Sequence, residues 1–108
     1  LFRSAALSMD LDSHKALYER FAERLRRGES LGPEVSMLKI FQSELFQRIS
    51  ELGLEVAGED SALLQPFAED PELHPAGIFI QSRPTTIYGG SNEIQRNILA
   101  KSVLGLPG

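Results

Sequence analysis

Apolar residues in the first quarter of the chain, together with one histidine, recur at alternating steps of four and three positions. This spacing places them on one face of an α-helix, with charged residues on the other faces. The chain already reads as helical at its first residue, and three arginines precede Gly28, where a helix C-terminus favours cations. The pattern predicts a long amphipathic helix that ends at Gly28. Its predicted inner face consists of Leu7, Leu11, His14, Tyr18, Phe21 and Leu25.

A second series with the same spacing follows a predicted turn between Gly28 and Pro33. Proline suits the first position of a helix, and Gly58 marks the end of this one. Two long helices joined by a short turn are expected to pack as an antiparallel hairpin. The predicted inner face of the second helix consists of Val35, Leu38, Gln42, Leu45, Ile49, Leu52 and Val56.

The remainder of the chain predicts shorter elements. Prolines and acidic residues between positions 58 and 75 predict a loop with about one helical turn. The apolar stretch 76–83 is too short for periodicity to separate helix from strand, and we favour a helix that the following proline ends. A last helix is expected to open at Ser91 and to end before Gly105. The predicted fold class is therefore all-α, an up-down helical bundle.

Composition and charge narrow the classes of function. A chain of 108 residues, 42% of them hydrophobic, suits one soluble domain, and its net charge of −4 disfavours nucleic acid or an anionic membrane as partner. The absence of cysteine excludes disulfides and thiolate chemistry, and two distant histidines leave little for a metal site. There is neither an apolar run long enough for a membrane span nor a signal-peptide pattern. We expect a soluble, cytoplasmic protein.

The segment 85–96 has the most informative pattern in the chain. Gly89 and Gly90 permit positive φ angles and close backbone approach, and a helix N-terminus with exposed N–H groups follows at Ser91. Such an arrangement can seat an anion, for example a pyrophosphate. A plain turn followed by a helix cap is the alternative, and the residues alone favour it.

Other polar residues are expected to be structural. His14 lies on the apolar face of the first helix and is expected to be packed and hydrogen-bonded, whereas His74 lies in a loop and is expected to face solvent. Glu44 and Glu51 share one helical face and resemble a carboxylate pair, but a solvated helix surface accounts for them better.

Residues 86–100, with the sequence TIYGGSNEIQRNILA, and Val-Leu-Gly-Leu-Pro at 103–107 closely resemble the C-terminal signature of the acyl-CoA dehydrogenases. The resemblance is strongest to bacterial members with an Ile-Tyr-Gly-Gly pattern. The stretch 32–39 also resembles the start of a long helix in the C-terminal bundle of that family. The implied parent has a helical domain, a β-domain and a C-terminal helical bundle. Residues 1–108 would be a single C-terminal domain of it, with one bundle helix missing upstream.

The implied activity is the FAD-dependent oxidation of an acyl-CoA thioester to the 2-enoyl-CoA. A carboxylate removes the α-proton while the β-hydrogen leaves as hydride to the flavin, and an electron-transfer flavoprotein accepts the electrons. In straight-chain members the base is a Glu at the position of Gly89, so this position supplies no catalytic residue here. An earlier helix could supply the base, or the parent could be a base-less subunit of a heteromeric enzyme. The parent is expected to be a homo-oligomer and the isolated chain to be inactive.

The resemblance also assigns contacts near the glycine pair. Glu93 stands where straight-chain members have Gln, and an ionised carboxylate neither donates a hydrogen bond nor tolerates a phosphate, which favours backbone contacts. A buried tyrosine beside a tight turn is an alternative role for Tyr88. The implied FAD contacts are Gly90, Ser91, Asn92 and Glu93, and the implied acyl-pocket residues are Tyr88 and Gly89.

Two further classes of function remain open from the sequence. One is a helical oligomerisation or interaction module without chemistry of its own. The other is a different flavin enzyme on the same fold, such as an acyl-CoA oxidase or a flavin-dependent monooxygenase, because residues outside this segment set the oxygen reactivity of the flavin.

Overall fold

The structure is a computed structural model that describes residues 2–63, 65–66 and 70–108. The described residues form helices joined by turns, which confirms the predicted all-α class. Three short 3-10 segments cover Pro33–Val35, Gly58–Ala62 and Arg83–Thr86, and a π-helical turn, Leu99–Val103, extends the last helix. The α-helices are α1 (Phe2–Arg26), α2 (Ser36–Ala57), α3 (Pro75–Ser82) and α4 (Asn92–Ile98).

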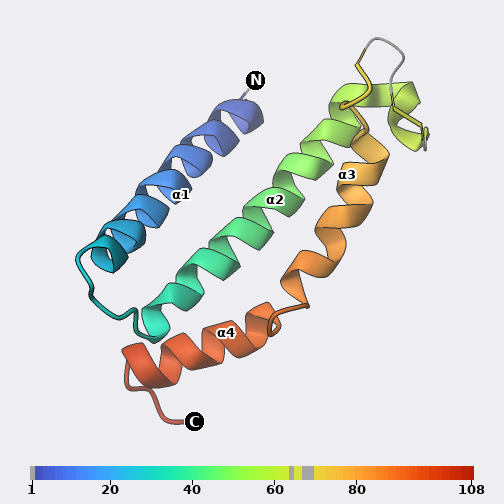
Figure 1. Cartoon of the computed structure of the whole chain (residues 1–108). Helices are drawn as coiled ribbons and strands as arrows, with labels where there is room; N and C mark the ends of the chain where they lie inside the picture. The colour runs from blue at the N-terminus through green and yellow to red at the C-terminus, as the bar shows by residue number, and fades with distance from the viewer. Residues whose placement is uncertain (1, 64, 67–69) are drawn as a thin grey trace.

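Helix α2 is the centre of the arrangement (Figure 1). Helix α1 lies antiparallel along one side of α2, and α3 lies along the other side. Helix α4 crosses near the end of α2 that adjoins the α1–α2 turn, and the chain ends beyond it. The molecule is elongated, with principal extents of 49 × 31 × 25 Å. Within the described residues, no helix has both the length and the apolar character needed to cross a membrane.

Helix α1 ends as the sequence predicts. Gly28 has a φ of 79°, a left-handed conformation that favours glycine. Its N–H donates to the carbonyl of Leu25 at 2.9 Å, and the N–H of Glu29 donates to the carbonyl of Arg24 at 3.0 Å. This pair of bonds is the Schellman arrangement, which satisfies carbonyls left free at a helix C-terminus. The local sequence alone therefore sets the turn into the next helix.

Helix α2 ends where the sequence predicts, but it begins at Ser36, after the predicted start at Pro33. The chain enters it through the 3-10 turn Pro33–Val35, and it ends before Gly58, which has a φ of 57°. The antiparallel hairpin of α1 and α2 is confirmed. Phe21 of α1 and Leu45 of α2 are buried, and the rings of His14 and Phe41 pack edge to face with 5.3 Å between their centroids.

The predicted inner face of α1 is only partly covered. Leu7 and Phe21 are buried and His14 is half-buried. The remaining members of the face are exposed: Leu11, Tyr18 and Leu25. Helical spacing thus identified one face correctly, but nothing among the described residues covers half of it.

The short apolar stretch in the last third of the chain is a helix, as favoured. Helix α3 begins at Pro75, and the chain continues as a 3-10 turn through the following proline to Thr86. The predicted helical turn before it is the 3-10 segment Gly58–Ala62. Residues 64 and 67–69 of the predicted loop lie outside the described residues.

A polar seam joins α2 to the C-terminal segment, and the sequence analysis did not predict it. The hydroxyl oxygens of Ser50 and Ser82 lie 2.9 Å apart, and Ser82 is completely buried. The Gln47 amide donates to the backbone carbonyls of Ser82 and Arg83, at 3.2 Å each. Small hydroxyl side chains let the helices approach closely, and the hydrogen bonds satisfy their polar atoms. The buried polar residues are Ser36, Ser43, Ser50, Ser82, Thr85 and Asn92.

Candidate functional site

The glycine turn, residues 88–91, connects the 3-10 segment after α3 to α4. Gly89 and Gly90 have φ angles of 67° and 87°, so both need the conformational freedom of glycine. The Gln95 side-chain amide donates to the carbonyl of Gly89 at 3.1 Å, and a Cβ on Gly90 would lie 2.8 Å from the same Gln95 nitrogen. A Cβ on Gly89 would meet nothing within 4 Å. The turn is therefore closed at Gly90 and open at Gly89.

Helix α4 begins where the sequence predicts, and its first turn is already capped. The Ser91 hydroxyl accepts from the N–H of Ile94 at 3.4 Å. The backbone N–H of Glu93 and then the Ser91 hydroxyl stabilise the Glu93 carboxylate, which holds the pKa of that carboxyl below its usual range. The Glu93 carboxylate thus adds a negative charge at the helix start, where the sequence pattern permits an external anion.

Asn92 turns away from solvent and toward α2. It is 2% exposed, and its side-chain carbonyl accepts from the Lys39 ammonium at 2.7 Å. Its side-chain NH₂ donates to the hydroxyl of Ser43 at 2.9 Å, and that hydroxyl donates to the backbone carbonyl of Lys39 at 2.7 Å. The amide is hydrogen-bonded on both sides within the protein. A ligand could therefore reach this side chain only by breaking these bonds.

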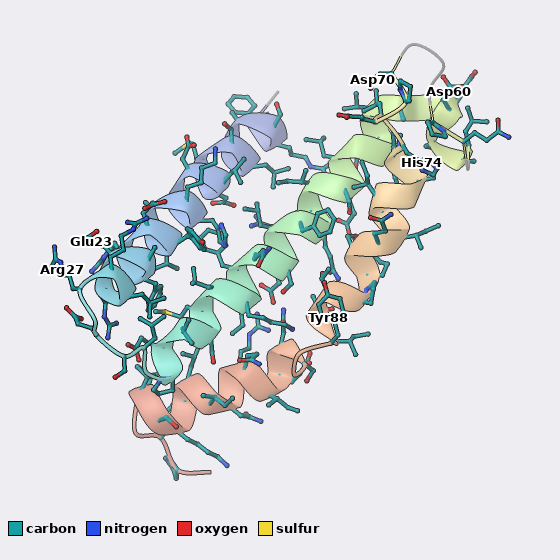
Figure 2. All side chains as sticks on the ribbon, viewed as in Figure 1. Glu23, Arg27, Asp60, Asp70, His74 and Tyr88 are labelled. Carbon is teal, nitrogen blue, oxygen red and sulfur yellow. The ribbon has the colours of Figure 1, made fainter. Side chains whose placement is uncertain are left out.

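A hollow of about 160 Å³ lies between α2 and the glycine turn. Tyr88 stands at the corner between α3 and α4 (Figure 2) and is 61% exposed, so the alternative of a buried tyrosine does not hold. The hollow combines an aromatic ring with amide, hydroxyl and ammonium groups. Its lining residues are Lys39, Gln42, Ser43, Phe46, Thr85 and Tyr88.

Glu44 and Glu51 do not act as a carboxylate pair. Glu44 forms an ion pair with Arg96, and Glu51 pairs with Arg83 at 3.1 Å. Both carboxylates are partly exposed, in agreement with the predicted solvated surface, but their arginine partners were not predicted. The two ion pairs hold the C-terminal segment at two points along α2.

The two histidines depart from expectation in different ways. His14 is packed as predicted, but its buried Nε2 has no hydrogen-bond partner among the described residues. The prediction that His74 faces solvent is wrong, because the residue is half-buried and its Nε2 is buried. Its ring lies against Gly77, where the missing Cβ leaves room. His74 and Tyr88 lie at opposite ends of α3 (Figure 2). In the part of the chain that the structure describes, no three potential metal ligands gather.

Comparison with known proteins gives one consistent result. Residues 2–104 match the family model of the acyl-CoA dehydrogenase C-terminal domain. The acyl-CoA dehydrogenase IpdE1 of Mycobacterium tuberculosis (strain ATCC 25618 / H37Rv) is 42% identical over 69 residues, and the protein of the same name from Mycolicibacterium smegmatis (strain ATCC 700084 / mc(2)155) is 39% identical over 69 residues. Each alignment covers 64% of this chain but only 17% of the relative, and no solved structure matches. Because the family model spans nearly all of its residues, the chain belongs to the acyl-CoA dehydrogenase family and corresponds to the C-terminal domain.

Proposed function

We propose that residues 1–108 are the C-terminal helical-bundle domain of an FAD-dependent acyl-CoA dehydrogenase of the Ile-Tyr-Gly-Gly type, which oxidises an acyl-CoA thioester to the 2-enoyl-CoA. The observation that carries this proposal is the glycine turn, open at Gly89, within a chain that matches the family's C-terminal domain over residues 2–104. The matched segment covers 17% of the named relatives, so the isolated chain is expected to be inactive. A bundle helix upstream and the two other domains would complete the enzyme.

The residues of the turn fit the uncharged part of FAD better than its phosphates. The open backbone at Gly89 admits a flat group, and Gly90 and Ser91, which are half-buried, offer backbone contacts beside it. The Glu93 carboxylate can accept hydrogen bonds from hydroxyl groups, but it repels a phosphate at the first turn of α4. When bound, FAD accepts the hydride from the acyl chain. The cofactor-contacting stretch on this proposal is Gly90, Ser91, Asn92 and Glu93.

Tyr88 and Gly89 border the acyl group in this proposal, and they position it without removing a proton. Gly89 carries no carboxylate, so the base comes from outside residues 1–108 or from an active partner subunit in a heteromeric enzyme. The remaining expectations follow from the family: acyl-CoA as substrate, an electron-transfer flavoprotein as acceptor, homo-oligomeric assembly and a cytoplasmic location.

The test uses the full-length protein that carries these residues. We expect it to purify with bound FAD, and we expect acyl-CoA to bleach the flavin absorbance anaerobically. A colourless protein that takes up no added FAD would contradict the proposal. Reoxidation by oxygen alone, without an electron-transfer flavoprotein, would instead assign an acyl-CoA oxidase or monooxygenase.

A matched pair of glycine variants tests the role of the turn. Gly89 and Gly28 both have positive φ angles and open space at the position of a Cβ, so a Gly→Val change strains both backbones alike. Only Gly89→Val places a side chain against the acyl group or the flavin. We expect it to slow flavin reduction by about tenfold or more, whereas Gly28→Val leaves the rate unchanged. Equal losses in the two variants would show a general effect of backbone strain.

The exposed apolar side chains favour a second function, a helical interaction module. Leu11, Tyr18 and Leu25 share one face of α1 by their helical spacing, and they are 37%, 55% and 55% exposed. Exposed apolar residues that gather on one face mark surfaces of association. Light scattering of the 108-residue chain should then show oligomers, and a clean monomer would contradict this second function.

A further inference from the structure

The start of α4 is fastened to α2 by a small buried cluster. Asn92 and Ser43 are 2% and 4% exposed, and Lys39 is half-buried beside them. Lys39 donates to the Asn92 side-chain carbonyl at 2.7 Å, and the Asn92 NH₂ donates to Ser43 at 2.9 Å. These bonds connect residues more than 45 positions apart in the sequence. The cluster therefore fixes where α4 begins relative to α2.

The glycine turn lies between this cluster and a second buried anchor. Thr85 is buried, and its hydroxyl donates to the backbone carbonyl of Ser82 within the polar seam. Residues 86–91 connect Thr85 to Asn92, and they include the two glycines with positive φ. The Gln47 amide of α2 also donates to the Thr86 hydroxyl at 3.3 Å, so both ends of the turn are hydrogen-bonded to α2. We expect a change at either end to shift the open face of Gly89.

Lys39 faces the same site from the side of α2. It lines the hollow together with Tyr88, and its ammonium forms no ion pair within the described ranges, only the hydrogen bond to Asn92. The nearby Glu93 carboxylate is exposed and held by its own N–H and by Ser91. Removal of Lys39 would leave the buried carbonyl of Asn92 with only the longer contact to the Ser43 hydroxyl, at 3.3 Å, and removal of Asn92 would leave the ammonium without its acceptor.

We infer that Lys39 and Asn92 are positioning residues, whose hydrogen bond sets the location of the glycine turn beside the hollow. Asn92 acts through Lys39 and Ser43, and its side chain does not contact the cofactor. This inference rests on the proposed function where it is tested by FAD binding and flavin circular dichroism. Its test by hydrogen exchange of backbone amides does not depend on the proposed function.

The experiment compares variants of the full-length holoprotein. Lys39→Met and Asn92→Leu each remove one partner while they keep similar volume, and a double variant combines them. Lys39→Arg keeps a cationic donor and serves as the conservative rescue. Arg48→Met is the matched control, because Arg48 lies on the same helix but pairs at 2.8 Å with Asp10 of α1, away from the turn.

Two measurements on the flavin are informative. We expect Lys39→Met and Asn92→Leu each to weaken FAD binding by about tenfold, and the double variant to be no weaker than either single variant, because both break the same bond. The visible circular dichroism of the bound flavin should change in both variants and return in Lys39→Arg. The inference would be overturned if the double variant lost FAD affinity by the product of the two single losses. It would also be overturned if Arg48→Met lost as much FAD affinity as Lys39→Met. A role limited to folding would lower the yield of holoprotein without changing the spectrum of the flavin that is bound.

Hydrogen exchange at the backbone amides of Tyr88 and Gln95, which donate to the carbonyls of Pro84 and Ser91 at 3.0 and 2.9 Å, tests the same inference without the flavin. We expect faster exchange there in Lys39→Met and Asn92→Leu, and unchanged exchange in Arg48→Met. If these amides exchange at the wild-type rate in Lys39→Met, the inference is wrong. If the protein binds no FAD while the exchange changes as expected, the proposed function fails and the positioning role stands.

Discussion

Helix α2 contacts α1 on one side and α3 and α4 on the other, and the two sides differ in their chemistry. Toward α1 it presents rings and aliphatic groups, such as Phe41 against the edge of His14. Toward α3 and α4 it presents hydroxyl and amide groups, among them Ser50 against Ser82 and Ser43 against Asn92. Figure 1 shows the two sides separated by the full width of α2. One helix thus combines an apolar interface with a polar seam.

The difference bears directly on the candidate site. Apolar contacts are non-directional and fix the position of a helix only through packing, whereas buried hydrogen bonds specify partners and orientation. The glycine turn is attached on the polar side, between Thr85 and Asn92. The candidate site depends on where the backbone of Gly89 and Gly90 lies. Directional hydrogen bonds fix that position more accurately than additional buried apolar area would.

The largest expected effect is on the apolar side. Phe21 is 6% exposed, and Phe21→Ala should lower the free energy of unfolding by about 4 kcal/mol, because it leaves a cavity the size of a ring. Phe2 on the same helix is 93% exposed, so Phe2→Ala should change stability little. Denaturant unfolding of both variants measures the contrast. Equal effects would show that α1 does not pack on α2 as described.

A smaller but specific effect is expected in the polar seam. Ser82→Val should cost about 2 kcal/mol, because it removes the bond to Ser50 and forces methyl groups into a fully buried position. Ser8→Val on exposed α1 surface is the control, since both changes introduce a β-branched residue into a helix. Hydrogen exchange in α3 and α4 should rise only in Ser82→Val. A neutral Ser82→Val variant would mean that the seam contributes nothing to docking.

The sequence predicted the two long helices well, their covered faces in part and the polar seam poorly, for a physical reason. Of the predicted inner face of α2, Gln42, Ile49 and Val56 are exposed. Periodicity of apolar residues identified both long helices. Gly28 and Gly58 marked their C-terminal ends, and Ser91 marked the start of α4. The seam uses Ser43 and Ser50, whose type is typical of a solvated face. Their seven-residue spacing, shared with Ser36, was the one signal of a common helix face. Only the tertiary structure shows that another helix lies on it.

In the candidate site, too, some features could be predicted from the sequence and others only from the tertiary structure. The open turn at Gly89 and the cap at Ser91 follow from local preferences, because glycine tolerates a positive φ and serine is a favoured helix N-cap. The buried amide of Asn92 could not be predicted, because its partners Lys39 and Ser43 are about fifty positions away. The family resemblance implies that Asn92 contacts FAD, and this contact stays a prediction. The structure adds that its side chain already has partners.

The smallest expected effect is a change in the pKa of two carboxyl groups, one on each side of α2. Glu34, at the α1–α2 turn, has its pKa lowered first by a hydrogen bond from the Arg24 guanidinium at 2.7 Å. Glu93, at the start of α4, has its pKa lowered first by its own backbone N–H and then by Ser91. Because both pKa values lie below those of the unfolded chain, each group stabilises the fold above the ordinary glutamate pKa. That stabilisation is lost as the pH falls through the lowered value.

NMR titration of the two carboxyls separates the two causes. Arg24→Met should raise the pKa of Glu34 and leave that of Glu93 unchanged, and Ser91→Ala should raise the pKa of Glu93 only in part, because its own N–H remains. Added salt should raise the pKa of Glu34 more than that of Glu93, since ions screen a charged partner more strongly than neutral donors. If salt raised both pKa values equally, Glu93 would depend on charges such as Lys39 and Arg96. The first turn of α4 would then attract anions. Glu93 would in that case not keep phosphates away from the glycine turn.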